Sequence, residues 1–226
     1  MFRKYSYDYE WDEEYCYPDS HVLINRLGIT DSEALSAAER EITSLKLAMA
    51  MQKPIKGRFD LQHLQKIHKY IFGDVYAWAG KLRHVNIAKG NQFCLAQNLE
   101  QYAESIFGKL EREHYLIGAG DTIPYRLAHY LSEINVLHPF REGNGRTQRL
   151  FIMYLANIAG YAVDFSEITP EEMIIASAES FACEYGKINA MFEKITVPIP
   201  LEEQKKHIQY FFGKNSAAMQ YFLKIG

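Results

Sequence analysis

The chain has 226 residues, of which 48% are hydrophobic, and a formal net charge of -3. This length predicts one domain, with or without an appendage, and the apolar content is enough for a substantial core. The slight acidic excess argues against a nucleic-acid-binding protein, because such domains usually carry a basic excess. It leaves room for a compact phosphate site, for which a few arginines suffice.

The cysteines and the N-terminus indicate the compartment. Cys16, Cys94 and Cys183 form no CxxC pair, so the pattern argues against a disulfide framework or a cysteine zinc site and predicts free thiols. The N-terminal residues are acidic and rich in tyrosine, and they lack the apolar segment of a signal peptide. The longest apolar stretch, residues 150–165, is interrupted by polar residues and is too short to span a membrane. We therefore expect a cytoplasmic protein, and delivery to another cell is left open.

In chain order, residues 1–20 are predicted to be an irregular lead-in. Asp31 or Ser32 can cap a long helix that runs to Met51, and Asp60 can cap the next one. The apolar residues of this second helix fall on one face, which predicts the side that packs on the core: Leu61, Leu64, Ile67 and Ile71.

Residues 82–95, LRHVNIAKGNQFCL, differ from their neighbours. Lys89, Gly90 and Asn91 form a turn signal with an extended run on either side. This pattern predicts a short β-hairpin.

The remainder is predicted to be helical. Helices are expected over residues 98–110, from a cap at Thr122 to the residues before Pro139, after the glycine-rich segment as far as Gly160, from a cap at Thr169, and over residues 189–195 and 201–212. The fold class is therefore all-α, or mainly α, with one small hairpin. We divide the chain into the lead-in over 1–20, a domain over 21–196 and a C-terminal helical extension over 197–226.

One run of twelve residues, HPFREGNGRTQR from His138 to Arg149, carries groups suited to phosphate chemistry. A helix ends there, a loop passes through Gly143, Asn144 and Gly145, and a new helix begins. Successive N–H groups of such a loop can point inward as a nest for an anion, and the start of the helix adds its unpaired N–H groups and positive dipole end.

The charged residues of this run extend the same interpretation. Arg146 and Arg149 share a face of the new helix, and both can fork onto phosphate oxygens, which suits a di- or triphosphate. Glu142 is placed to hold Mg²⁺ between the phosphates, because this ion typically takes only one or two carboxylates. His138 can accept a proton from an attacking hydroxyl. Each group alone is usually structural, and their combination in twelve residues is what predicts a site.

This run resembles the signature of the Fic family, HxFx(D/E)GNGRxxR. The chain matches every defined position, which are His138, Phe140, Glu142, Gly143, Asn144, Gly145, Arg146 and Arg149. Upstream, IHKYIFGDVYAWAGKLRHVNIAKGNQF is similar to the family's IF-x-DVY-x-WAG-x-x-R segment and the hairpin, called the flap, that follows it. The likeness covers about residues 20–195.

The resemblance implies a helical bundle around a central helix-loop-helix, and the transfer of AMP from ATP to a Ser, Thr or Tyr hydroxyl of a target protein. His138 would be the base and Glu142 the Mg²⁺ ligand. The amides of residues 143–145 would hold the α- and β-phosphates, and Arg146 and Arg149 the outer phosphates of the leaving pyrophosphate. The flap, with Lys89, Gly90 and Phe93, would position the target; Lys89 could equally be a solvated turn residue.

Many members of the family restrain themselves with an inhibitory helix of the pattern [S/T]xxxE[G/N], whose glutamate pairs with the second arginine of the signature. Ser180 and Glu184 match the first part of this pattern, but Tyr185 stands where Gly or Asn belongs. We therefore interpret this segment as an ordinary turn of a helix. Restraint by a small separate antitoxin, as in the family's toxin–antitoxin pairs, is the corresponding expectation.

Two alternatives stay open at the level of the sequence. The same fold could use another donor, such as UTP for UMP transfer or CDP-choline for phosphocholine, because a phosphate nest does not read the base. The second alternative is a non-catalytic nucleotide-binding regulator.

His63 and His68 are five residues apart, which is wrong for paired zinc ligands, so Mg²⁺ arriving with ATP is the only metal that we predict.

Overall fold

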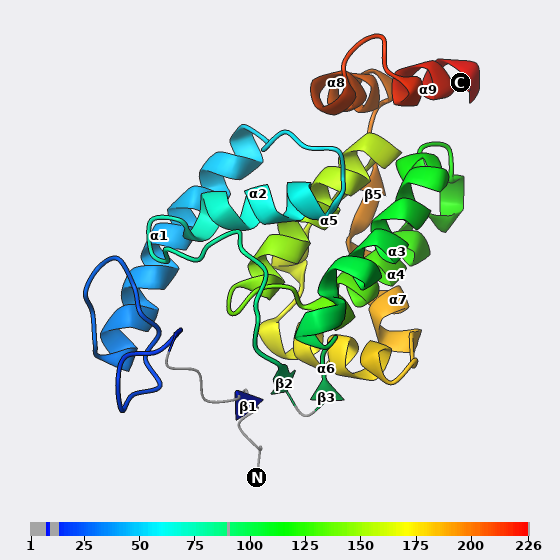
Figure 1. The fold of residues 1–226 in the computed structure, drawn as a ribbon. Coiled ribbons are helices and arrows are strands. Elements are labelled where there is room, and N and C mark those ends of the chain that lie inside the picture. Colours follow the sequence, from blue (N-terminus) through cyan, green and yellow to red (C-terminus); the bar gives the residue numbers. More distant parts are fainter. Residues whose placement is uncertain (1–7, 10–13, 90, 226) are drawn as a thin grey trace.

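The computed structural model describes residues 8–9, 14–89 and 91–225 of the chain, and these form a mainly helical fold (Figure 1). The α-helices are α1 (Ser32–Gln52), α2 (Leu61–Phe72), α3 (Leu99–Arg112), α4 (Ile123–Leu137), α5 (Asn144–Ala159), α6 (Pro170–Phe181), α7 (Gly186–Ile195), α8 (Leu201–Phe212) and α9 (Ala217–Ile225). Short 3₁₀ helices lie at Ala96–Asn98, His114–Leu116, Gly120–Thr122 and Phe165–Glu167.

Helix α5 is the centre of the fold. It packs against α2, α4 and α8, and each of its residues is buried or half-buried. Phe151, Leu155 and Ile158 of α5 are completely buried in the main hydrophobic core. Burial of such a side chain contributes about 1.5–3 kcal/mol, so the position of α5 is firmly held.

Three of the four predicted helix caps are confirmed by their hydrogen bonds. The Asp31 carboxylate accepts from the N–H of Ala34, the Asp60 carboxylate accepts from the N–H of His63, and Thr169 forms a capping box with Glu172. Thr122 occupies the predicted N-cap position of α4, but its hydroxyl donates to the carbonyl of Ala119 and forms no cap hydrogen bond.

Two small antiparallel sheets accompany the helices. Strands β2 (Ile87–Lys89) and β3 (Asn91–Gln92) pair as the predicted hairpin, with Ala88 opposite Gln92. Strand β1 (Asp8–Tyr9) pairs with the other edge of β2, which gives the order β1-β2-β3. Strands β4 (Tyr161–Val163) and β5 (Thr196–Pro198) form the second sheet. Neither β1 nor this second sheet was predicted, because two or three residues are too few to show an alternating pattern.

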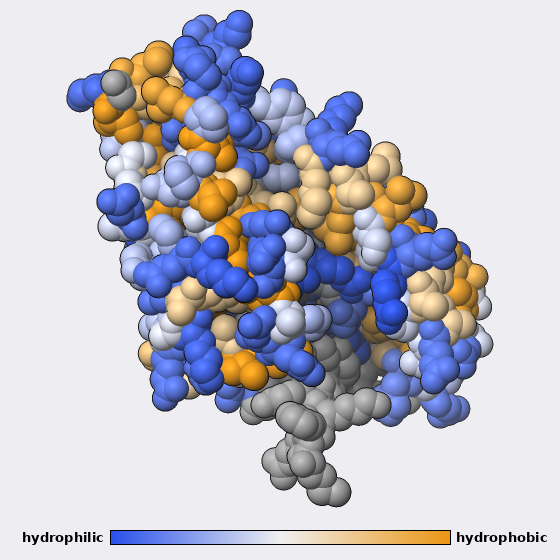
Figure 2. All heavy atoms as spheres, turned by 180° about the vertical axis from the view of Figure 1, so that it is seen from behind, coloured by the Kyte–Doolittle hydropathy of each residue, from blue (hydrophilic) through white to orange (hydrophobic). Residues whose placement is uncertain are grey.

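The C-terminal helices pack on the same core. Helix α8 has the predicted bounds, and the amide of Gln204 donates to the carbonyl of Ile158 in α5 at 3.0 Å. Helix α9 was not predicted, and α7 begins at Gly186, before the predicted start at residue 189. Hydrophobic side chains gather on the surface at this end of the molecule (Figure 2), among them Leu223 and Ile225. The predicted domain boundary after residue 196 falls inside β5, and the division into three segments stays a prediction.

Two further findings concern the chain as a whole. The three cysteines are free thiols, as predicted. Among the described residues, no helix combines the length and apolar character needed to cross a membrane.

Candidate active site

His138 lies where α4 ends. Its backbone is left-handed, with φ 42° and ψ 60°, and Pro139 follows it, so the helix cannot continue. The side chain is buried, with 5% exposure, and its Nδ1 lies 3.2 Å from the carbonyl oxygen of Asn135. Because a carbonyl only accepts, Nδ1 is the protonated nitrogen. Nε2 is therefore the nitrogen of this ring that can take up a proton.

The hairpin is attached directly to this histidine. The ring of Phe93 stacks on the imidazole, with centroids 3.8 Å apart and planes 15° from parallel. The N–H of Cys94 donates to the carbonyl of Val136 in α4 at 2.9 Å. The flap predicted from the sequence is thus fixed at its base, beside the residue predicted to be the general base.

Arg83 joins the hairpin to the loop that follows α4. It is 2% exposed, and its guanidinium donates to three backbone carbonyls, those of His138 at 2.8 Å, Val85 at 2.7 Å and Cys94. Its own N–H donates to the carbonyl of Pro139. Hydrogen bonds from a charged donor contribute about 1.5–3 kcal/mol each, so the two segments behave as one unit.

The side chain of Asn144 holds the loop between Phe140 and Asn144 in place. The Asn144 amide accepts from the N–H of Phe140 at 2.9 Å and donates to its carbonyl at 2.7 Å. Phe140 is 1% exposed and stacks on the ring of His68, with centroids 3.9 Å apart, so it anchors the loop in the hydrophobic core.

His68 holds the same loop through its two nitrogens. Nδ1 accepts from the N–H of Gly80 at 2.8 Å, so Nε2 carries the proton and donates to the carbonyl of Glu142 at 2.9 Å. Burial lowers the pKa of His68 to about 3, because desolvation disfavours the charged ring. His68 is therefore a neutral positioning residue, and the sequence did not reveal this role.

Gly143 is required by both its conformation and its surroundings. Its φ is 81°, and a Cβ atom there would lie 2.3 Å from the ring of Phe72. The turn at Gly143 lets α5 begin at Asn144, whose first-turn N–H groups have no acceptor within the helix. The carboxylate of Glu142 accepts from the N–H of Gly143 at 2.8 Å, so this acid lies at the positive end of α5.

The two arginines of the run have different surroundings. Arg146 donates to the Glu39 carboxylate at 2.6 Å and to the Thr43 hydroxyl at 3.0 Å, and its guanidinium lies over the ring of Phe72. Arg149 is half-buried and has no acidic partner among the described residues. Burial lowers the pKa of Arg149, and the charge of Arg146 adds to this effect.

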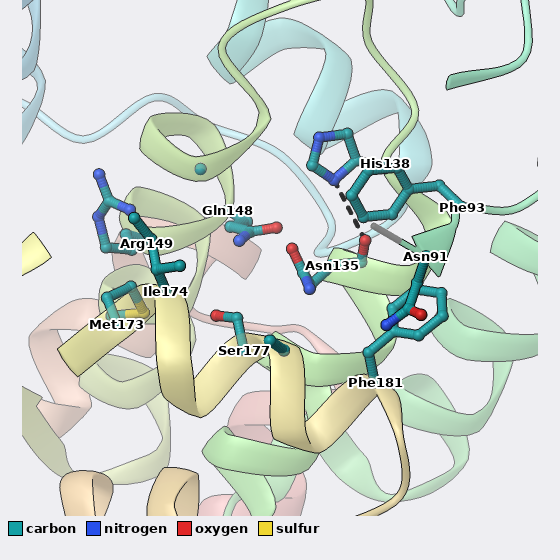
Figure 3. A pocket seen from close by; sticks show the side chains of 12 residues that line it. Asn91, Phe93, Asn135, His138, Gln148, Arg149, Met173, Ile174, Ser177 and Phe181 are labelled. Carbon is teal, nitrogen blue, oxygen red and sulfur yellow. Dashed lines mark hydrogen bonds between the residues drawn. The ribbon is translucent and has the colours of Figure 1, made fainter. Parts of the chain in front are cut away.

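A pocket of about 770 Å³, including its mouth, opens over the start of α5 (Figure 3). Helix α6 forms the opposite wall, and α4 and the hairpin form the end beside His138. The lining residues are Asn91, Phe93, Asn135, His138, Gly145, Gln148, Arg149, Met173, Ile174, Ser177, Ala178 and Phe181. The size and the largely apolar wall suit a small molecule with an anionic end.

The predicted site residues are therefore only partly brought together. His138, Gly145, Arg149 and Phe93 line the pocket, whereas Arg146 turns toward α1 and is not part of the lining. The phosphate role predicted for Arg146 stays a prediction, and the observed contacts favour a role in holding the loop. Sequence reasoning also missed Glu39, because nothing in α1 marks it as a partner of the run.

Two of the remaining predicted residues belong to the hairpin. Lys89 ends β2, and Gly90 lies outside the described residues. Ser180 is buried in α6 and donates to the carbonyl of Ser177, and Glu184 is exposed in the turn after α6. Neither of this inhibitory-helix-like pair reaches the wall that holds Arg149.

The residues around Glu142 fit a magnesium ion that is held mainly by a nucleotide. The described part of the chain holds no cluster of three His, Cys, Asp or Glu side chains that could bind a metal without a substrate. Glu142 offers one carboxylate beside the start of α5, and Mg²⁺ commonly completes its shell with phosphate oxygens and water.

Comparisons with known proteins agree with this geometry. Residues 58–156 match the Fic/DOC family. The protein adenylyltransferase VbhT of Bartonella schoenbuchensis is 42% identical over 80% of this chain, which spans 37% of VbhT. The probable protein adenylyltransferase Fic of Salmonella typhimurium is 39% identical over 82% of this chain and 92% of its own length. The crystal structure of BepC, a VirB-translocated effector of Bartonella tribocorum with bound AMPPNP, has a TM-score of 0.78 and 26% identity, and the match covers 84% of this chain and 99% of the chain in that structure.

Proposed function

The chain belongs to the Fic/DOC family, and we propose that it is a protein adenylyltransferase. It transfers AMP from ATP to a Ser, Thr or Tyr hydroxyl of a target protein and releases pyrophosphate. The observation that carries this proposal is the shared pocket, in which His138 lies at one end, Arg149 at the other, and the start of α5 between them. The relatives that are named adenylyltransferases and the AMPPNP bound by BepC support it.

His138 acts as the general base. Its Nδ1–H is held by the carbonyl of Asn135, so Nε2 accepts the proton of the target hydroxyl. The hydroxyl oxygen forms a bond to the α-phosphorus, the bond from that phosphorus to the bridging oxygen of the β-phosphate breaks, and pyrophosphate leaves. A placed base of this kind typically contributes about 10²–10⁴-fold in rate.

The start of α5 and Arg149 hold the triphosphate. The first-turn N–H groups after Gly143 donate to phosphate oxygens, and the guanidinium of Arg149 forks onto the outermost phosphate. Mg²⁺ bound at Glu142 would add positive charge between the phosphates.

The target segment pairs with β3. Strand β1 already occupies the outer edge of β2, whereas β3 carries Asn91 to the pocket and leads to Phe93 on the catalytic ring. A peptide added to the edge of β3 would therefore present its hydroxyl near His138. Addition of a strand to an exposed edge is a common mode of peptide recognition.

A separate inhibitor protein can act at Arg149. This guanidinium is half-buried and has no carboxylate partner in the described part of the chain, so an acidic side chain from an antitoxin would compete with the outer phosphate. The cytoplasmic location expected from the sequence belongs to the same proposal. Delivery to another cell is the variant that BepC, a translocated effector, suggests.

The test uses the full chain and a cell lysate with Mg²⁺ and ATP labelled at the α-phosphate. We expect labelled protein with the wild type, none with His138→Ala, and normal labelling with the matched control His129→Ala. His129 also lies on α4 but contacts Lys109 and is not part of the pocket. A parallel reaction uses ATP labelled at the γ-phosphate, and labelled protein from this donor alone would indicate a kinase and contradict the proposal.

The donor is tested in the same reaction. Excess unlabelled UTP or CDP-choline should leave the labelling from ATP unchanged. Loss of labelling with either competitor would point to that donor, and tight ATP binding without any transfer would favour the non-catalytic regulator.

A further inference from the structure

The side-chain amide of Gln148 is buried in the pocket with an unsatisfied oxygen. Gln148 lies on α5, one turn after Gly145, and is 5% exposed. Its Oε1 is inaccessible to solvent and has no hydrogen-bond partner in the protein. Most buried polar groups in native proteins have a partner, so this oxygen calls for an explanation.

The position of Gln148 distinguishes it from other buried polar atoms. Trp78 and Thr196 also bury a side-chain atom without a partner, but neither residue lines the pocket. Figure 3 shows the Gln148 side chain reaching into the pocket, between Arg149 on one side and Asn135 on the other. The unpaired oxygen therefore belongs to a side chain that lines the space of a bound molecule.

The surroundings indicate which part of a nucleotide lies there. The N–H groups at the start of α5 and the guanidinium of Arg149 provide the anion-binding end. The opposite wall is largely apolar, with Met173, Ile174 and Phe181 of α6 beside Ser177. A nucleotide whose phosphates lie at the start of α5 therefore has its nucleoside between α5 and α6, within reach of Gln148.

We propose that Gln148 determines nucleotide specificity by accepting a hydrogen bond, through its buried Oε1, from a donor on the nucleoside of the bound nucleotide. This inference rests on the proposed function, because it assumes that a nucleoside triphosphate is the donor substrate. Adenosine offers two kinds of donor, the ribose hydroxyls and the 6-amino group. A site built around a buried acceptor rejects an analogue that lacks the donor, since the acceptor is then left unpaired.

The experiment measures binding by titration calorimetry for the full-length wild type and Gln148→Met, which keeps the length of the side chain but removes the amide. The ligands are ATP, 2′-deoxy-ATP, 3′-deoxy-ATP and purine riboside triphosphate, which lacks the 6-amino group. The matched control is Gln204→Met. Gln204 is also a buried glutamine, but it lies on α8 and donates to the carbonyl of Ile158, outside the pocket.

We expect the wild type and Gln204→Met to bind ATP about tenfold or more tightly than the one analogue that lacks the relevant donor. Gln148→Met should bind ATP and that analogue equally, with the weaker affinity. Discrimination against a deoxy analogue identifies a ribose hydroxyl, and discrimination against the purine analogue identifies the amino group. Thermal unfolding should show Gln148→Met to be at least as stable as the wild type, because the substitution removes an unsatisfied polar group.

Other outcomes overturn the inference. Equal affinity of the wild type for all four ligands, or unchanged discrimination in Gln148→Met, would show that Gln148 does not read the nucleoside. Nucleotide affinities unaffected by Gln148→Met together with a raised KM for the target protein would assign the contact to the target. Failure of the wild type to bind any nucleotide would instead refute the proposed function.

Discussion

Acidification should weaken this fold through two buried histidines, His63 and His68. Burial lowers the pKa of His63 to about 4 and that of His68 to about 3, from an ordinary value of 6.5. The unfolded chain therefore takes up protons between pH 6.5 and these lower values, whereas the folded chain does not. The stability contribution of each neutral histidine is complete above pH 6.5 and is lost as the pH falls toward the pKa of the folded state.

The magnitude follows from the size of the two shifts. A pH of 5 lies above the folded-state pKa of each histidine and well below its unfolded-state pKa. The free energy of unfolding is therefore lowered by about 2 kcal/mol per histidine. Together His63 and His68 should lower the free energy of unfolding by about 4 kcal/mol between pH 7 and pH 5. This is a large part of the stability of an ordinary domain.

Urea unfolding at pH 7, 6 and 5 would test this for the wild type, His63→Gln and His68→Gln. Each variant should lose about 2 kcal/mol less than the wild type over this range, because glutamine does not titrate. The reasoning would be refuted by equal losses in all three proteins.

The two variants should differ in activity at neutral pH. The Nε2–H of His68 donates to the backbone carbonyl of Glu142 in the loop before α5. His63 instead contacts Ile55 and Phe59, away from the pocket. The transfer rate should therefore fall in His68→Gln and stay near the wild-type value in His63→Gln. The opposite pattern would show that the contact with Glu142 does not position the loop.

Five other substitutions test the framework of the site. Arg83→Lys leaves buried carbonyls unpaired and should lower the free energy of unfolding in urea by about 2–4 kcal/mol. The same substitution should lower the transfer rate more than the affinity for ATP. An unchanged transfer rate would show that the position of the hairpin does not affect catalysis. Gly143→Ala should cost about 2–5 kcal/mol in the same assay, part from the left-handed backbone and part from overlap with Phe72, and only the second part should be recovered by Phe72→Leu. Glu39→Gln should change ATP affinity less than about twofold in a calorimetric titration, whereas Arg149→Ala should lower it about tenfold or more; equal effects would contradict the different roles of the two arginines.

Local sequence patterns determined most of the helices. Asp31, Asp60 and Thr169 cap the N–H groups of residues three positions later, so each cap depends only on its own segment. The turn at residues 89–91 likewise indicated the hairpin from a few adjacent residues. Helix α9 was not predicted. Thr122 takes its predicted position at the start of α4 without a side-chain cap hydrogen bond, because its hydroxyl donates to the nearby carbonyl of Ala119.

The candidate site was visible in the sequence because its groups lie in one run of twelve residues, and a helix-loop-helix brings His138 and Arg149 to one pocket. Tertiary structure alone decided what each group contacts. Arg146 meets Glu39 from 107 residues earlier, and the carbonyl of Glu142 meets His68 from 74 residues earlier. The Gln148 side-chain oxygen is likewise buried without a hydrogen-bond partner because of the way α4, α5 and α6 pack around it. Caps and turns are fixed by neighbours along the chain, whereas these contacts depend on which helices pack together, and a single sequence does not state that packing.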